Sequence, residues 1–400
     1  MKEGWEYKKL DDICTIVGRI GFRGYTKADL VDSPNDGAIT LSPSNITNGE
    51  LDFSKCTYIS WDKYNESPEI MLAKGDVVLV KTASIGKCAV VKELPHKATL
   101  NPQFVVLKGI IGEPNFIGYY LKSPVAQITI KQMAGGVAIP TLSQKKLGTM
   151  LIPSPPLSEQ QRIVDYLDSA FAKIDAMKAN AEKALNEAKA LFQASLKEML
   201  EPKEGWEEKK LKEIVISITD GDHQPPPKSN DGIPFITISN IDKNSNKIVF
   251  EDTFYVPQSY FSALKKDRIP QNGDVLYTVT GSFGIPVLID YQKEFCFQRH
   301  IALIRPNMDI LSPTFLFYWI LSSYAMCQAE DTATGAAQRT VSLNSLRNFT
   351  ICVPSLSEQQ SIVATLDSLK SKVDQLQENC EKISQECDAL KQAILRQVFE

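Results

Sequence analysis

Long hydrophobic runs are absent from this sequence of 400 residues. The longest purely apolar stretch, Phe315 to Leu321, is far too short to cross a bilayer. The opening residues, Met1-Lys2-Glu3-Gly4-Trp5, do not have the pattern of a secretory signal peptide. A membrane-spanning or secreted protein is therefore not expected.

Paired cysteines and metal-ligand clusters are also missing. The eight cysteines form no CxxC pair, and His96, His223 and His300 stand apart from any cysteine or carboxylate cluster. No Ser/His/Asp or Cys/His set can be assembled either. We therefore expect reduced thiols in a cytoplasmic protein, with no metal site and no catalytic residue in this chain.

The sequence also lacks an excess of positive charge. Lys and Arg number 44 against 48 Asp and Glu, which gives a formal net charge of −4. A purely electrostatic, non-specific nucleic-acid binder would be basic, so that class is disfavoured. A sequence-specific binder stays open, because a local basic face can act while acidic residues lie elsewhere.

What the sequence does contain is an internal repeat. The segment Lys2-Glu3-Gly4-Trp5 returns as Lys203-Glu204-Gly205-Trp206, and Leu157-Ser158-Glu159-Gln160-Gln161 returns as Leu356-Ser357-Glu358-Gln359-Gln360. Repeats of this kind determine architecture, and here they divide the chain into two copies of one unit. The residues between these anchors differ widely, which indicates one frame with two different recognition surfaces.

Each copy combines short strands with a few helices. Gly75-Asp76-Val77 and Gly273-Asp274-Val275 open matched turn-plus-strand segments rich in Val, Leu and Tyr. Helices are expected near Pro114 and Pro313, each followed by a glycine-containing loop. The uneven mixture indicates an α+β fold rather than a βαβ repeat. The expected domains are 1–156 and 202–355.

The last part of each copy predicts a long helix, over 157–201 and 356–400. Ser158 to Gln161 and Ser357 to Gln360 match the S-x-x-Q capping box. Apolar residues then alternate at spacings of four and three, the seam of a coiled coil. The seam residues are Val164, Leu167, Phe171, Ile174, Ala181, Leu185, Ala188 and Phe192, then Ile362, Leu366, Leu369, Val373, Leu376, Cys380, Ile383, Cys387, Leu390 and Ile394. Two such seams are expected to bury each other as an antiparallel pair separating two domains related by a pseudo-two-fold axis.

A family resemblance rests on these motifs and their order. Both copies begin with Gly-Trp-x-x-Lys-Lys-Leu, contain Gly-Asp-Val and Ser-Asn-Ile, and end in Leu-Ser-Glu-Gln-Gln with a long helix. This organisation resembles the DNA-specificity (S) subunit of type I restriction–modification enzymes. The likeness covers essentially the whole chain.

The resemblance implies a function and a set of partners. In that family each globular part is a target-recognition domain that reads one half of a split, asymmetric site in double-stranded DNA. The helices hold the domains apart and dock two methyltransferase subunits, to which motor–endonuclease subunits can add. The chain itself performs no catalysis, and S-adenosylmethionine belongs to the methyltransferase partner. Half-sites about one helical turn, ~10 base pairs, apart fit two readers on a rigid spacer.

Candidate DNA-contacting residues are polar or charged side chains in loops, because bidentate and directional hydrogen bonds discriminate bases. A residue that differs between the copies is the better candidate. Ser44-Asn45-Ile46 and Ser239-Asn240-Ile241 occur in both, so we assign them to the common frame. The candidates are Arg19, Arg23, Tyr25, Lys27, Lys81 and Lys87 in the first copy, and His223, Gln224, Lys228, Thr280, Ser282 and Arg299 in the second.

Two other functions compete with DNA reading. Asn101-Pro102-Gln103-Phe104 is close to the Asn-Pro-Pro-Phe loop of amino-methyltransferases, but the second copy has Phe297-Gln298-Arg299-His300 in its place. No convincing glycine loop for S-adenosylmethionine accompanies it, so we interpret the tetrapeptide as a strand-edge coincidence. The other competitor is a two-headed coiled-coil scaffold that bridges protein partners.

Overall fold

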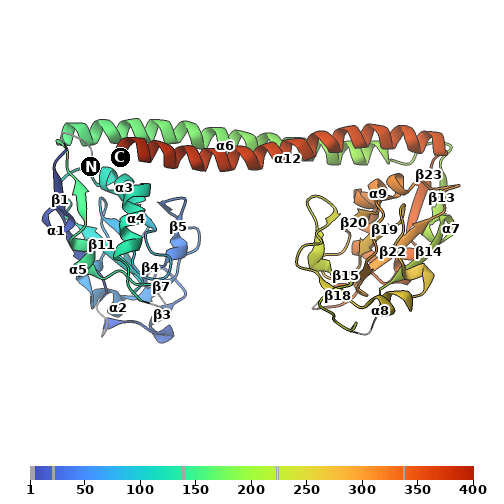
Figure 1. Ribbon diagram of the computed structural model, residues 1–400, viewed down its shortest axis with the longest axis horizontal. Helices are drawn as coiled ribbons and strands as arrows, with labels where there is room; N and C mark the ends of the chain where they lie inside the picture. The colour runs from blue at the N-terminus through green and yellow to red at the C-terminus, as the bar shows by residue number, and fades with distance from the viewer. Residues whose placement is uncertain (1–4, 20–22, 137–139, 222, 224, 337) are drawn as a thin grey trace. The chain divides into compact units, whose positions relative to one another are not determined.

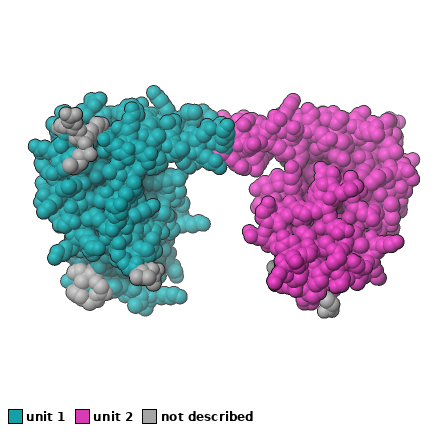
Figure 2. Space-filling view, in the orientation of Figure 1, with its two compact units in different colours: residues 1–180, 382–400 teal, residues 181–381 magenta. Residues whose placement is uncertain are grey.

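The chain divides into two compact units that combine distant parts of the sequence. The computed structural model describes residues 5–19, 23–136, 140–221, 223, 225–336 and 338–400. Unit 1 consists of residues 1–180 and 382–400, and unit 2 of residues 181–381 (Figure 2). Each unit therefore takes part of both long helices (Figure 1).

Unit 1 is built on an antiparallel four-stranded sheet in the order β2-β11-β8-β9. Its strands are β2 (Thr15–Val17), β11 (Phe104–Lys108), β8 (Val77–Val80) and β9 (Cys88–Val90). A second sheet has the order β10-β4-β7-β3, with β10 and β4 parallel. Its strands are β10 (Ala98–Leu100), β4 (Gly37–Leu41), β7 (Tyr58–Ser60) and β3 (Leu30–Val31).

Shorter elements complete unit 1. They are α1 (Leu10–Ile13), α2 (Trp61–Asn65), α3 (Pro114–Lys122), α4 (Pro124–Met133), α5 (Gln144–Gly148), the hairpin β5 (Ile46–Thr47) and β6 (Glu50–Leu51), and the pair β1 (Tyr7–Lys9) and β12 (Leu151–Pro153).

Unit 2 repeats this plan. Its main sheet has the order β14-β22-β19-β20, also antiparallel, and its second sheet the order β18-β15-β21. The main strands are β14 (Val215–Asp220), β22 (Ile301–Pro306), β19 (Val275–Thr278) and β20 (Pro286–Leu288); the others are β18 (Phe254–Val256), β15 (Ile233–Ile236) and β21 (Cys296–Phe297).

The remaining elements of unit 2 have counterparts in unit 1. They are α7 (Leu211–Ile214), α8 (Gln258–Ser262), α9 (Pro313–Leu321), α10 (Ser323–Thr332), α11 (Leu343–Arg347), the hairpin β16 (Ile241–Asp242) and β17 (Lys247–Ile248), and the pair β13 (Glu207–Lys210) and β23 (Thr350–Val353). The predicted α+β class and the internal repeat are confirmed.

Strand periodicity explains why each main sheet is buried on both faces. In β8, Val77 and Leu79 join the core that contains the helices, whereas Val78 and Val80 join the core under the second sheet. In β19, Val275 and Leu276 likewise belong to different cores. Because successive strand residues point to opposite faces, an unbroken apolar run is what such a central strand requires.

The long helices are α6 (Leu157–Met199) and α12 (Leu356–Phe399), and they are antiparallel within each unit. In unit 1, Val164 and Leu167 share a core with Leu395 and Phe399. In unit 2, Phe192 and Leu196 share a core with Ile362 and Leu366. Residues early in one helix thus pack with residues late in the other.

The predicted seam is right for most of its positions and wrong for two. Val164, Ile174 and Cys387 are buried, but Leu376 and Leu390 are exposed. A straight α-helix has 3.6 residues per turn, so a strict spacing of 3.5 drifts around the helix and leaves some seam positions on the outside.

A buried glutamine fastens each long helix to its own domain. The Gln359 amide donates to the carbonyl oxygens of Ile310 and Pro354, and its oxygen accepts from the Ser312 N–H at 2.8 Å. In unit 1 the Gln160 amide donates to the carbonyl oxygen of Pro155, and its oxygen accepts from the Glu113 N–H. The expected capping boxes are wrong, because the helices already begin at Leu157 and Leu356 and the Gln161 amide donates to Asp165 instead.

A tyrosine–carboxylate contact is repeated in the same way. The Tyr119 hydroxyl donates to Asp168, and the Tyr318 hydroxyl donates to Asp367 at 2.6 Å. Burial, aided by the neighbouring carboxylate, raises the pKa of both phenols. Each domain is therefore held to α6 or α12 by a hydrogen bond from a protonated phenol to a carboxylate.

Among the described residues, no helix combines the length and hydropathy that a membrane span requires.

Candidate nucleic-acid interface

The strand ends of each main sheet gather polar residues at one edge. In unit 1, β2 and β8 end where the antiparallel β11 begins, with Val80 opposite Phe104. In unit 2, Thr278 lies opposite Ile301 in the same way, and Asp220 lies opposite Ala302. The opposite ends of β11 and β22 lead toward Glu113 and Ser312. The backbone N–H groups of these two residues donate to Gln160 of α6 and Gln359 of α12. We call the edge remote from the long helices the distal edge.

Both distal edges have the same backbone frame. The N–H of Lys81 donates to the carbonyl of Gln103, and the carbonyl of Lys81 accepts from Leu142. In unit 2 the N–H of Val279 donates to His300, and its carbonyl accepts from Val341. Identical hydrogen bonds therefore present Lys81 and Gln103 in one unit, and Val279 and His300 in the other.

The frame also contains the motifs that recur in both copies. Asn45 and Asn240 are buried, and each accepts a backbone hydrogen bond from the residue three positions earlier. Asp76 binds Lys108 at 2.6 Å, and Asp274 binds Arg305 at 2.7 Å. These contacts confirm that Ser-Asn-Ile serves the frame and give the same role to Gly-Asp-Val.

Arg19 lies at the distal edge but points into the protein. Its side chain is 4% exposed, and its guanidinium donates to the carbonyls of Leu100 and Arg23 and to the Thr99 hydroxyl. Burial lowers the pKa of the Arg19 guanidinium, and Tyr25 and the nearby carboxylates partly offset this shift. In this arrangement Arg19 organises its loop instead of offering donors to a base.

The other candidates of unit 1 are divided between two places. Lys81, whose pKa is lowered by burial, follows β8 at the distal edge, and the exposed Lys87 lies there just before β9. Arg23 pairs with Glu69 at 3.6 Å, the Tyr25 hydroxyl accepts from Thr40, and Lys27 is exposed in a short 3-10 helix. These last three lie beside the second sheet.

Most candidates of unit 2 lie together at the distal edge. His223 is exposed and within 2.9 Å of Asp220 at the end of β14, and Arg299 is exposed just before β22. The pKa of His300 is lowered by partial burial and then by the positive charges of Arg299 and His223, which places the three groups in one electrostatic cluster.

The remaining candidates of unit 2 have mixed environments. Thr280 is buried and its hydroxyl accepts from Thr340, whereas Ser282 is exposed in the turn after β19. Lys228 is exposed with its ammonium over the Phe254 ring. Gln224 lies outside the described residues. Ser282 is thus available to a ligand, while Thr280 is already engaged.

Sequence reasoning missed several residues at this edge. Gln144 at the start of α5 reaches Gly18, which follows β2. Arg339 joins the edge of unit 2 through its carbonyl, which accepts from Gly281, and its guanidinium lies over Phe283. Gln103 and His300 occupy matched positions with different side chains. Comparing the two copies position by position would have found that pair.

The edge offers hydrogen-bond donors, acceptors and cations on a rigid sheet, which are the groups that read bases and bind phosphates. Asn101, by contrast, is buried and accepts from the Gln103 N–H within a turn, so the Asn-Pro-Gln-Phe segment is a turn between strands.

Comparison with known proteins supplies the family. The profile described as "Type I restriction modification DNA specificity domain" matches residues 2–187 and again residues 203–385. The chain belongs to this family. The two matches coincide with the two copies of the repeat, so this specificity subunit carries two such domains.

Individual relatives are distant but extensive. The specificity subunit of the type I restriction enzyme EcoKI from Escherichia coli is 23% identical, with 100% of this chain and 89% of that protein covered. The EcoBI specificity subunit, also from Escherichia coli, is 25% identical over 70% of this chain and 64% of its own length. The MjaVIII specificity subunit from Methanocaldococcus jannaschii is 24% identical over 93% of this chain and 87% of that protein.

Solved structures share the fold of this specificity subunit. A structure described under complex assembly and conformational transition of the type I R-M system has a TM-score of 0.72 at 22% identity, covering 100% of this chain and 98% of that one. The HsdS subunit from Thermoanaerobacter tengcongensis has a TM-score of 0.54 at 21% identity, covering 99% and 97%.

Proposed function

We propose that each distal edge reads one half of a split, asymmetric site in double-stranded DNA. The observation that carries this proposal is the pair of matched backbone frames with different side chains. Lys81 and Gln103 form one surface, whereas Arg299, His300 and Ser282 form the other. Arginine favours guanine, and glutamine favours adenine, so two different surfaces select two different base sequences.

In this proposal the specificity subunit performs no catalysis of its own and acts in the cytoplasm. S-adenosylmethionine is held by a methyltransferase subunit, and the distal edges only select the sequence. Motor–endonuclease subunits can join that assembly. The polar groups of the distal edges suit base and phosphate contacts rather than acid–base or nucleophilic chemistry.

The long helices support a partner that binds twice. Three exposed apolar positions recur in both copies: Leu157, Met177 and Leu191 correspond to Leu356, Leu376 and Leu390. Because the helices are antiparallel, unit 1 presents Leu157, Met177 and Leu390, and unit 2 presents the other three. Exposed apolar side chains that recur in a pattern mark interaction surfaces. Two equivalent surfaces favour two copies of one methyltransferase subunit.

Exchange of one reading surface tests the proposal. We would express this subunit with its neighbouring methyltransferase in a host without DNA methylation, and map modified adenines by single-molecule sequencing. In the variant, residues 215–350 are replaced by those of a relative, which keeps both long helices. We expect a split motif in which only one half changes.

A reciprocal exchange of residues 15–150 is the matched control and should change only the other half. A motif that survives both exchanges would contradict the proposal. So would absent modification with a folded, active partner, and that outcome would favour the protein-bridging scaffold.

A further inference from the structure

A groove of about 1190 Å³ in unit 1 has an unusual concentration of lysines. It lies between the β5–β6 hairpin, the turn before β9, α3 and α4, and the paired helices α6 and α12. We call it the lysine groove. The lysines that line it are Lys87, Lys92, Lys122, Lys131 and Lys391.

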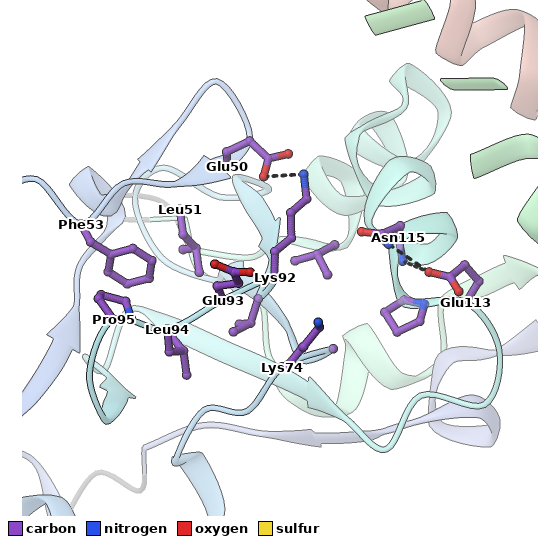
Figure 3. Close-up of a pocket in the computed structure, with 14 residues that line it drawn as sticks. Glu50, Leu51, Phe53, Lys74, Lys92, Glu93, Leu94, Pro95, Glu113 and Asn115 are labelled. Atoms are coloured by element: carbon purple, nitrogen blue, oxygen red, sulfur yellow. Dashed lines mark hydrogen bonds and ion pairs between the residues drawn. The ribbon is translucent and has the colours of Figure 1, made fainter. Parts of the chain in front are cut away.

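The carboxylates of the groove engage only part of this charge. Glu50 pairs with Lys92 at 3.0 Å, a contact visible in Figure 3, and lies 3.8 Å from Lys122. Asp175 pairs with Lys391. Asp168, the third carboxylate, accepts from the Tyr119 hydroxyl.

Two exposed lysines of the groove lie outside these ion pairs. Lys87 and Lys131 have no ion-pair partner among the described residues. The groove as a whole therefore has a surplus of positive charge, five lysines against three carboxylates.

The corresponding groove of unit 2 has the opposite charge. Its volume is about 600 Å³, and it is lined by Lys247 and Lys370 against Asp290, Asp367, Asp374 and Glu378. Lys370 is already paired with Asp374 at 3.0 Å. Its Asp290, Tyr318, Asp367 and Asp374 match Lys92, Tyr119, Asp168 and Asp175 of the lysine groove, but among the described residues its lining includes none from α10 or α6.

Matched positions show the reversal directly. Val90 pairs with Val77 in unit 1, and Leu288 pairs with Val275 in unit 2. Lys92 lies two residues after Val90, and Asp290 lies two residues after Leu288. Lys92 and Asp290 therefore occupy equivalent positions. In the equivalent helices α4 and α10, Lys131 corresponds to Glu330. Lysine in unit 1 is thus replaced by a carboxylate in unit 2 at two places.

The mouth of the lysine groove lies at the distal edge. Lys87 lies in the turn between β8 and β9, immediately before β9, at the same end of the sheet where Lys81 follows β8. Lys131 on α4 and Lys391 on α12 line the same groove. A duplex held at the distal edge would bring its backbone to this opening.

We propose that the lysine groove binds the phosphate backbone of DNA beside the first half-site, and that unit 2 has no equivalent contact. This inference rests on the proposed DNA reading. Lysine ammonium groups are point charges that suit phosphates, and continuity with the distal edge favours DNA over an acidic protein segment. Unit 1 then supplies most of the salt-dependent affinity, although the chain as a whole is acidic.

Salt dependence of binding tests the proposal. The subunit is assembled with its methyltransferase, and the affinity for duplex DNA is measured from low to high salt. The variant Lys87→Gln/Lys131→Gln removes two exposed charges. We expect the slope of log K against log salt to become shallower by about 2, because each lost phosphate contact contributes about 0.9. The methylated motif keeps its sequence, since phosphate contacts carry no sequence information.

Two further variants make the comparison specific. Lys243→Gln/Lys247→Gln changes the net charge equally at exposed positions of unit 2 and should leave the slope unaltered. Asp290→Lys/Glu330→Lys converts unit 2 toward the unit 1 pattern and should steepen it. If the two Lys→Gln double variants changed the slope equally, the proposal would be overturned, because the change in slope would then depend on net charge alone.

The remaining outcomes separate this proposal from the one on which it rests. An unaltered slope combined with loss of methyltransferase binding would assign the groove to a protein partner and refute DNA binding there. If the wild-type assembly methylated no split motif, the two-reader function would be refuted. The salt slopes of the wild type and the variants, measured on any duplex that binds, would still show whether the lysine groove contacts phosphates.

Discussion

Arg19 and Arg299 have the same side-chain chemistry and opposite environments. Arg19 donates to main-chain carbonyls inside unit 1, whereas Arg299 is exposed beside His300. Residue type and loop position predicted both as DNA contacts. Only burial separates them, and burial depends on how the loop after β2 packs on residues 99–100, which no local pattern specifies.

The buried phenols predict a dependence of stability on pH. The pKa of Tyr318 is raised by burial and by Asp367, so the folded state keeps the proton that the unfolded chain loses above about pH 10. Its stabilising contribution is complete below that pH and is lost as the pH rises. For Tyr318→Phe we expect a loss of about 1 kcal/mol at pH 7, from the missing hydrogen bond, and a shallower decline from pH 10 to 11.

Urea unfolding followed at several pH values would measure both effects. Tyr166→Phe, at an exposed position of α6, should match the wild type throughout. An equally steep alkaline decline in Tyr318→Phe would show that Tyr318 does not carry this dependence.

At the scale of elements, the sequence was informative wherever a periodic pattern sufficed. The central strands follow Gly-Asp-Val, and the long helices lack glycine and proline, so both were predicted. The capping role expected for Ser158 and Ser357 was wrong, because both helices begin one residue earlier, and a buried glutamine holds each helix start to its domain instead. The parallel pairing of β10 with β4 and the distal edge depend on strand register between distant segments, which the repeat alone does not reveal.

Gln359 is expected to be the critical residue where α12 joins its domain. It makes three hydrogen bonds while fully buried, so Gln359→Leu would leave a backbone N–H and two carbonyls without that partner. We expect a loss of roughly 3 kcal/mol, since each unsatisfied buried group costs about 1–3 kcal/mol. Thermal unfolding measures it.

The neighbouring Gln360→Leu is the matched control, because Gln360 is exposed on the same turn and should change stability by less than about 0.5 kcal/mol. Similar losses in the two variants would mean that helix propensity or solubility, rather than the buried amide, determines the result.

At the scale of the molecule, the two units differ in how they are assembled from the chain. Unit 2 is one continuous stretch, whereas unit 1 needs residues 382–400 to complete its core. Phe399 is 3% exposed and packs against the rings of Trp5, Phe116 and Tyr120. The sequence-based domain limits at residues 156 and 355 stay a prediction about the globular parts. They do not describe how residues 382–400 complete the core of unit 1.

Removing residues 391–400 should therefore weaken unit 1 selectively. The deletion takes away the buried side chains of Leu395 and Phe399, each worth about 1.5–3 kcal/mol of burial. Hydrogen exchange should accelerate in β8 and β11 but not in β19 and β22. Leu390→Ala, at an exposed position, should affect neither set. Equal acceleration in both sheets would show that the units unfold together.

The divided composition of unit 1 has a consequence for biosynthesis. Domains usually fold in the order in which the ribosome makes them. Here the unit that is begun first cannot close until the segment carrying Leu395 and Phe399 emerges, whereas unit 2 is already complete by residue 381. Translation past that point takes on the order of seconds, during which the unit 1 surface that receives Phe399 is uncovered. A nascent chain that stalls there would display a finished second reader and an unfinished first one.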